Sequence, residues 1–524
     1  MVTVSGENPV KGEVGTVECR RAIVRLAIIA AVFVAAAGLT YLIPAAEALR
    51  PWVPGDDAPM KRLYTFDWSK GISGSGTESD GALKGEMARV SLAEGLGEEL
   101  AANLGSEAGV DQPVANRAAD SSASQPSLIS PDELVGLVRK IEDPSGKALD
   151  AFFRALQASA SGRSVTRIAH WGDSTIAADD VTGTLRRRLQ SRFGDAGHGF
   201  MLVGKGTMPY RHKDIETVQL GQWKQQMGIR RERRDGRYGY GGVAFTTWGG
   251  GSAWYKTVDK GPIGTSASSF EVFFQSHPAG GKVNLAVDGK PAGTIDTRAG
   301  EVADGFRKIQ VVSGPHRFDI DTEGEVRLYG VAIEDDGPGV VYDSLGMVGA
   351  RAQRFQNFDP AHFAAQVAHR APDLLVIAFG GNECGDAMMD FDIYRENLRK
   401  TIDIVMAGRP TASCMLLAPL DQGEVGPRGR IRTMPAIPLI VQAQREVAAE
   451  KGCAFFDTFS AMGGEGSMAR WYKSRPRLGW GDYRHATPAG YEVIGNMIYK
   501  ALLASFSEWL ARSPEVEVPP SPGT

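Results

Sequence analysis

The stretch RIAHWGDST, residues 167–175, sets a short and largely apolar run directly before a Gly-Asp-Ser-Thr tetrapeptide. Residues 164–170 are expected to form a β-strand, and Asp179 can cap a helix that follows. Apolar side chains recur every four residues in that helix, at Val181, Leu185, Leu189 and Phe193. The tetrapeptide is therefore predicted to lie on a turn from a strand to a helix, with Ser174 at the carboxyl end of the strand.

The same α/β pattern returns after residue 340. Residues 374–379, LLVIAF, form a continuous apolar run, as expected of a parallel strand covered on both faces. Two further strands are predicted at 415–418 and 454–457, and helices are predicted at 394–406, 437–451 and 488–509. The sequence therefore predicts a three-layer, flavodoxin-like α/β domain made of residues 131–204 and 339–512, around a parallel sheet.

Between these two parts the texture of the sequence changes. Glycine becomes frequent, and short alternating runs appear at 270–274, 282–287 and 307–312. Asp288-Gly289 separates two runs and is a strong turn signal. Residues 205–338 are therefore predicted to be an antiparallel β-sandwich inserted into the α/β domain.

The N-terminus carries a targeting signal. Leu26–Ile43 is almost entirely apolar, roughly the length of a membrane-spanning helix, and Arg20, Arg21 and Arg25 precede it. We expect residues 1–44 to be a cytoplasmic stub with an uncleaved single-pass anchor, which places the rest outside the cytoplasm, for example in a periplasm. A signal peptide cleaved near residues 45–48 is the alternative. Residues 45–130 and 513–524 are expected to be a disordered linker and tail.

Charge and cysteine content exclude several classes of protein. The formal net charge is −4, and acidic residues interrupt or follow the basic clusters at 186–188 and 230–234. We therefore expect solvated basic faces and no nucleic-acid partner. Cys414 and Cys453 lie near predicted strands and could pair, but buried free thiols are the favoured interpretation. His198 and His212 have no matching ligands at metal spacing, so we predict no metal and no cofactor.

A set of polar residues at predicted strand ends suggests nucleophilic chemistry. A serine hydroxyl needs a base to take its proton, and His485 is the candidate base for Ser174. Asp482, three residues earlier, can hold the imidazole in one tautomer. The amide of Asn382 and the backbone N–H groups of Ser174 and Gly346 could form an oxyanion hole. Alone, each piece also fits an ordinary capping turn or loop; only their joint occurrence is specific.

These residues resemble the four sequence blocks of the SGNH, or GDSL-type, hydrolases. The blocks are Gly172-Asp173-Ser174, Gly346, Gly380-Gly381-Asn382 and Asp482-Tyr483-Arg484-His485, although Glu383 follows the third block where many members have Asp. The resemblance implies Ser174, Asp482 and His485 as catalytic residues and Ser174, Gly346 and Asn382 as the oxyanion hole. Residues 170–174, 184–190, 193–200 and 342–350 further resemble the Ape-type peptidoglycan O-acetylesterases, which carry a carbohydrate-binding-like β-sandwich at this point of insertion.

The resemblance implies a serine esterase that removes O-acetyl groups from a cell-envelope polysaccharide, with peptidoglycan favoured, and the predicted N-terminal helix would anchor it to the membrane. An O-acetyltransferase with the same triad and a glycan-binding protein without activity are the alternatives. Trp248, Trp254 and Tyr255 in the insert could stack on sugar rings, although a place in the sandwich core is equally compatible with them. His170 is expected to be a packed strand residue and not a second base.

Overall fold

The computed structural model describes residues 129–205, 210–386 and 388–512 of the 524-residue chain. The predicted anchor, most of the predicted linker and the predicted tail lie outside these residues. Within the described residues, no helix is both long enough and apolar enough to cross a membrane.

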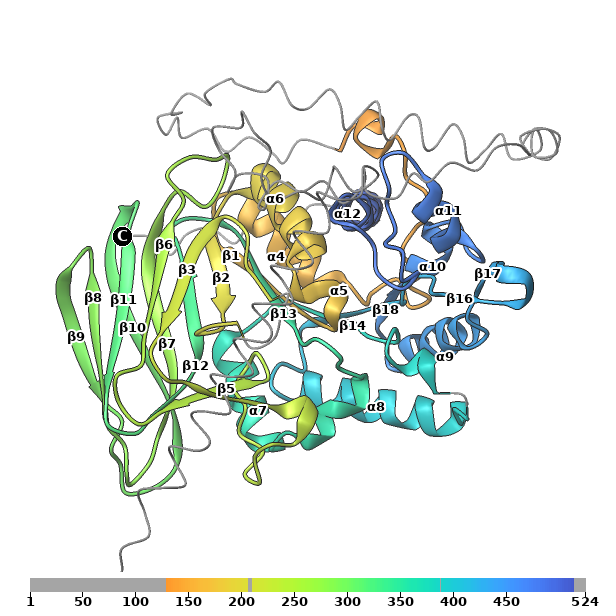
Figure 1. The fold of residues 1–524 in the computed structure, drawn as a ribbon. Coiled ribbons are helices and arrows are strands. Elements are labelled where there is room, and N and C mark those ends of the chain that lie inside the picture. The colour runs from red at the N-terminus through yellow and green to blue at the C-terminus, as the bar shows by residue number, and fades with distance from the viewer. Residues whose placement is uncertain (1–128, 206–209, 387, 513–524) are drawn as a thin grey trace, which may run out of the picture. The chain divides into compact units, whose positions relative to one another are not determined.

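A parallel sheet forms the centre of the α/β part (Figure 1). Its order is β13-β1-β14-β15-β18, and all neighbouring pairs are parallel. The strands are β1 (Val165–Gly172), β13 (Gly339–Gly346), β14 (Leu374–Ala378), β15 (Ser413–Leu417) and β18 (Ala454–Phe456). The first strand thus lies between the second and third strands of this sheet, the doubly wound arrangement in which ligands meet the carboxyl edge.

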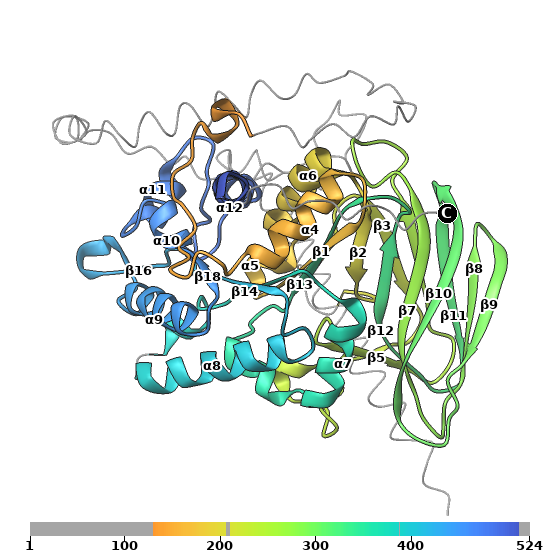
Figure 2. The same ribbon diagram turned by 180° about the vertical axis from the view of Figure 1, so that it is seen from behind.

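Helices cover both faces of this sheet (Figures 1 and 2). One layer contains α4 (Asp150–Ala160), α6 (Asp180–Phe193) and α12 (Pro488–Arg512). The other contains α7 (Pro360–Arg370), α8 (Phe391–Ala407) and α9 (Ala436–Glu450). The predicted apolar face of α6 is confirmed, because Val181, Leu185, Leu189 and Phe193 are all buried in one core cluster. The three-layer α/β prediction is therefore correct.

Two antiparallel sheets lie beside the α/β part. One has the order β10-β7-β12-β5-β4, with β2 also paired to β12, and the other has the order β3-β6-β11-β8-β9. Phe270 of the first sheet stacks on Phe318 of the second at 4.7 Å between ring centroids, so the sheets pack face to face. The bounds are β2 (Gly197–Met201), β3 (Ile215–Leu220), β4 (Lys224–Met227), β5 (Val243–Thr247), β6 (Ser252–Thr257), β7 (Ala267–Ser276), β8 (Lys282–Val287), β9 (Lys290–Asp296), β10 (Ala303–Gly314), β11 (Arg317–Glu323) and β12 (Val326–Glu334).

Short elements complete the loops at the carboxyl edge of the parallel sheet. They are α5 (Ser174–Ala177), the 3₁₀ turns η6 (Ala352–Asn357) and η7 (Glu383–Gly385), the hairpin of β16 (Gly423–Val425) and β17 (Ile431–Thr433), α10 (Thr458–Ala461) and α11 (Ser467–Lys473). The first of these begins directly at the end of β1, as the strand-to-turn pattern predicts.

A buried ionic network ties the parallel sheet to the antiparallel strands. Arg370 donates two hydrogen bonds to Asp343 of β13, at 2.8 and 2.9 Å, and also pairs with Glu334 of β12. Arg167 of β1 donates two hydrogen bonds to the Glu334 carboxylate, at 2.8 and 2.9 Å. Charge-assisted pairs of this kind fix orientation as well as contributing energy. The network therefore holds β12 of the antiparallel sheet against β1 and β13.

Two expectations about side chains are wrong. Cys414 and Cys453 form a disulfide and are not free thiols. Arg186, predicted to lie on a solvated face, is buried and pairs with Asp179 at 2.8 Å, because the segment around Asp214 covers this side of α6 and supplies a second carboxylate.

Candidate active site

Ser174 is held on a tight turn at the carboxyl end of β1. Asp173 caps α5, and its carboxylate accepts a hydrogen bond from the Thr175 N–H at 2.9 Å. Gly172 precedes it, where a Cβ would lie 2.3 Å from the Ile176 side chain, so only glycine allows α5 to fold back on the strand. Ser174 is the first residue of α5, and this placement fixes the direction of its hydroxyl group.

Three side chains from two distant parts of the sequence form a hydrogen-bonded series. The Ser174 Oγ lies 3.0 Å from His485 Nε2, and His485 Nδ1 lies 2.6 Å from Asp482 Oδ2. Since a carboxylate only accepts, Nδ1 carries the proton and Nε2 is left free to accept the serine proton. The geometry is that of a serine, its base and the group that orients the base.

The Asp482 carboxylate is also fixed by the backbone. Its Oδ1 accepts the N–H groups of Arg484 and His485, at 3.0 and 3.2 Å. Burial opposes ionisation, but the hydrogen bonds from Arg484 and His485 outweigh it and lower the pKa of Asp482. The carboxylate therefore stays charged at neutral pH, as a partner for an imidazolium must.

The predicted oxyanion-hole residues flank this turn. Gly346 ends β13 in register with Gly172, and a Cβ on Gly346 would lie 2.2 Å from the Ala177 backbone nitrogen. The Asn382 Nδ2 donates to the Ala350 carbonyl at 2.9 Å and lies 3.4 Å from the Asp173 carboxylate. The structure thus brings both residues to the loops beside Ser174, while their contact with an oxyanion remains a prediction.

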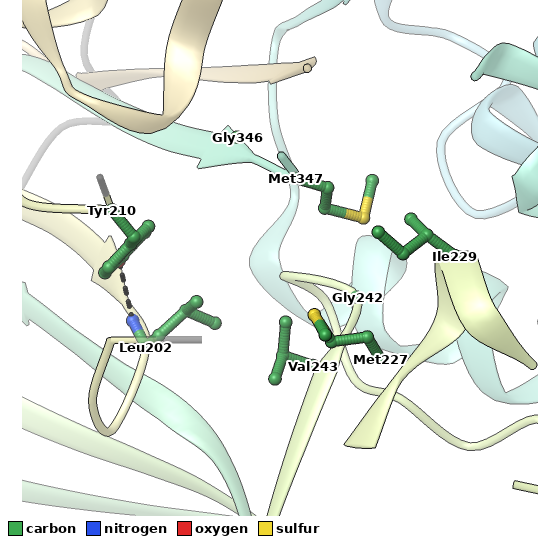
Figure 3. Close-up of a pocket in the computed structure, with 8 residues that line it drawn as sticks. All are labelled: Leu202, Tyr210, Met227, Ile229, Gly242, Val243, Gly346 and Met347. Carbon is green, nitrogen blue, oxygen red and sulfur yellow. Dashed lines mark hydrogen bonds between the residues drawn. The ribbon is translucent and has the colours of Figure 1, made fainter. Parts of the chain in front are cut away.

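A small apolar cavity lies on the insert side of Gly346 (Figure 3). Its volume is about 10 Å³, so it holds one water molecule at most. It is lined by Leu202, Tyr210, Met227, Ile229, Gly242, Val243, Gly346 and Met347. Side chains from the antiparallel part therefore pack closely against the end of β13.

The candidate sugar-stacking aromatics of the insert have different surroundings. Tyr255 is buried, and its hydroxyl donates to the Leu202 carbonyl at 3.1 Å, so the prediction that it contacts a glycan is wrong. Trp254 points to the opposite face of β6, under the Arg317 guanidinium at 4.5 Å. Trp248 is 62% exposed. A glycan-binding role for these two tryptophans stays a prediction.

His170, His198 and His212 are buried. His170 is buried and hydrogen-bonds Tyr342 at 2.8 Å, and burial lowers its pKa to about 3, so it packs as a neutral strand residue. His198 and His212 lie with their ring centroids 6.4 Å apart. Among residues 129–205, 210–386 and 388–512, no group of three or more His, Cys, Asp or Glu side chains is arranged to hold a metal ion.

Two exposed residues of the loop that carries Asp482 and His485 were not predicted as site residues from the sequence. Trp480 precedes Asp482 by two positions and is 54% exposed, and Arg484 is exposed between Asp482 and His485. Their position in the sequence could have indicated them, because both lie within five residues of His485, the proposed base.

Comparison with known proteins agrees with the block pattern. Residues 321–493 match the GDSL-like Lipase/Acylhydrolase family, a segment that contains Gly346, Asn382, Asp482 and His485. The match begins after Ser174, which the insert separates from the other blocks. No curated protein matches the chain significantly.

Solved structures with a similar fold include a peptidoglycan O-acetylesterase. The likeness covers 71% of this chain and 99% of that chain, at 22% identity and a TM-score of 0.59. Family two carbohydrate esterases from Clostridium thermocellum and Cellvibrio japonicus also match, at 11% and 14% identity, with TM-scores of 0.23 and 0.22. The likeness covers 56% of this chain and 99% of the other in each of these two cases.

Proposed function

We propose that this chain is a serine esterase that removes O-acetyl groups from a cell-envelope polysaccharide, with peptidoglycan as the favoured substrate. The match of residues 321–493 to the GDSL-like Lipase/Acylhydrolase family supports an enzyme that acts on ester bonds. The observation that carries the proposal is the hydrogen-bonded series from Ser174 through His485 to Asp482. The similarity of fold to a peptidoglycan O-acetylesterase supports the choice of substrate.

The reaction would proceed through an acetyl-enzyme. His485 Nε2 takes the proton of Ser174 as its oxygen attacks the acetyl carbonyl carbon. The N–H groups of Ser174 and Gly346 and the Asn382 amide stabilise the negative charge on the tetrahedral intermediate. One hydrogen of this amide has only a long contact, of 3.4 Å, to Asp173 and can therefore donate to the oxyanion. The intermediate then collapses, and the sugar hydroxyl leaves with the proton from His485.

Water completes the cycle. His485 removes a proton from the water as it attacks the acetyl-enzyme, and returns this proton to the Ser174 oxygen as the ester bond breaks. Acetic acid is released and ionises to acetate. The His485 and Asp482 side chains are 42% and 47% exposed, so solvent reaches the base directly. This exposure favours hydrolysis over transfer of the acetyl group to a second sugar.

The test is acetate release by the full-length protein. O-acetylated peptidoglycan and p-nitrophenyl acetate serve as substrates, and Ser174→Ala is compared with Thr175→Ala, which changes the neighbouring hydroxyl. We expect Ser174→Ala to lose at least about 10³-fold in kcat on both substrates, as expected when a nucleophile is removed. Unchanged activity in Ser174→Ala would sink the proposal. Acetyl transfer to an added glycan with little free acetate would favour a transferase.

We also propose that the enzyme works outside the cytoplasm, anchored by residues 26–43. The Cys414–Cys453 disulfide supports this place, since such bonds persist mainly in oxidising compartments. Fractionation of cells with trapping of free thiols tests it. The expected result is a membrane-associated protein with both cysteines oxidised, and a soluble cytoplasmic protein with reduced cysteines would overturn it.

A further inference from the structure

The loop that carries Asp482 and His485 is closed by its own backbone. Gly479 and Ala486 form an antiparallel bridge, and the Trp480 N–H donates to the His485 carbonyl at 2.8 Å. The Tyr483 N–H donates to the Trp480 carbonyl at 3.1 Å, inside the loop. Residues 480–485, the triad loop, therefore present their side chains in a fixed arrangement.

Trp480 presents an indole beside the catalytic base. It is 54% exposed, whereas core aromatic side chains of this chain are almost fully covered. Its backbone N–H donates to the His485 carbonyl at 2.8 Å, so the residue that carries this indole is held beside the proposed base. An indole face carries negative electrostatic potential and attracts the C–H groups on the apolar face of a sugar ring. Trp480 is thus suited to hold a pyranose next to Ser174.

Arg484 adds a positive charge from the same loop. Its side chain is exposed, and within the described residues it forms no ion pair and no side-chain hydrogen bond. Burial raises the pKa of the Cys384 thiol, and the charge of Arg484 opposes this rise, so the guanidinium lies within electrostatic range of that thiol. By contrast, the nearby Arg351 is engaged with both oxygens of Asp386.

The surroundings of Arg484 make its charge selective. Asp482, whose pKa is lowered, is a charged carboxylate of the same loop, and the chain as a whole has a net charge of −4. An anionic substrate would approach such a site only if a local cation faced it, because like charges repel. An unpaired guanidinium is also the group best suited to bind a carboxylate with two hydrogen bonds.

We propose that Trp480 and Arg484 form a subsite for an acidic sugar, in which the ring packs on the indole and a carboxylate of the sugar binds the guanidinium. This inference rests on the proposed esterase function and narrows its substrate to acetylated glycans that carry a carboxylate close to the ester. The subsite orients the acetyl group toward Ser174. A neutral acetylated glycan can pack on the Trp480 indole but has no carboxylate to bind Arg484.

The test compares acidic and neutral glycans. The acidic substrate is O-acetylated muramic-acid glycan freed of its peptides, the neutral one is O-acetylated chito-oligosaccharide, and kcat/KM on each gives an acidic-to-neutral ratio. We expect Arg484→Gln to lower this ratio about tenfold, mainly through KM, with a smaller loss in high salt. Arg484→Lys, which keeps the charge, should retain most of the ratio. Trp480→Ala should lower kcat/KM on both glycans relative to p-nitrophenyl acetate.

The control is Arg163→Gln. Arg163 is also exposed, and it precedes β1 at the opposite edge of the parallel sheet, so its loss changes net charge without touching the site. We expect this variant to match the wild type on every substrate. Equal ratios for Arg484→Gln and Arg163→Gln would overturn the subsite even if both glycans were hydrolysed. A wild type that hydrolyses p-nitrophenyl acetate but neither glycan would instead defeat the proposed function.

Discussion

Glu383 is a buried carboxyl group between the two loops that flank the nucleophile turn. One of its oxygens accepts the Ala352 N–H at 2.9 Å and the other accepts the Gly380 N–H at 3.2 Å. Burial raises the pKa of Glu383 from 4.5 to about 7; the Ala352 hydrogen bond opposes this rise, and the charge of Asp173 adds to it. Its titration therefore couples the stability of the site to pH.

The size and sign of this coupling follow from the pKa change. Since the native state binds the proton more tightly than the unfolded chain, the stabilisation is fully present below pH 4.5 and is lost as pH rises through about 7. A shift of this size corresponds to about 3 kcal/mol in full, most of which is lost between pH 5 and pH 8. Glu383→Gln removes the titration, but its amide accepts only one of the two N–H groups, at a cost of about 1–3 kcal/mol at every pH.

Urea unfolding at pH 5 and pH 8 measures the effect. From pH 5 to pH 8, the free energy of unfolding of the wild type should fall by about 2–3 kcal/mol more than that of Glu383→Gln. Glu492→Gln, which alters an exposed residue of α12, is the matched control and should follow the wild type. The reasoning is refuted if the wild type and Glu383→Gln show the same change with pH.

Three further predictions follow from the same contacts. Asp482→Asn should lower kcat by about 10³–10⁴-fold with little change in KM, because the base loses its orienting carboxylate; steady-state kinetics check this. Arg370→Met should lower the free energy of unfolding, measured in urea, by about 3–5 kcal/mol, since it leaves the buried Asp343 carboxylate without its positively charged partner. Cys414→Ser opens a loop of 39 residues to Cys453 and should cost about 4 kcal/mol, with no added loss on reduction.

The sequence predicted the elements that depend on local pattern. The helical face from Val181 to Phe193 and the apolar strand at 374–378 are read from spacing that tertiary structure does not change. The placement of Ser174 at a strand end followed from the same reading. These elements are sufficient to identify a doubly wound sheet and the edge at which a ligand would meet it.

Expectations that depend on tertiary neighbours were less reliable. Cys414 and Cys453 pair because β15 and β18 are adjacent parallel strands, and sequence alone does not order the strands of such a sheet. Arg186 is buried because a segment more than 20 residues away folds over α6. Trp254 and Tyr255 could not both have contacted the same glycan, because successive side chains of a strand point to opposite faces. That alternation, visible in β6, is a signal that the sequence already contained.

The insert and the α/β domain act on the nucleophile turn as one body. The Arg211 N–H donates to the Ala177 carbonyl at the end of α5, and the Trp171 indole donates to the Tyr240 carbonyl at 3.1 Å. Both contacts reach the few residues that set the direction of Ser174, and a shared apolar core continues between the two parts. Interfaces that are extensive and apolar suppress relative motion of domains. The insert therefore positions Ser174, the proposed nucleophile, directly, and a ligand bound on the insert would be held at a fixed distance from this residue.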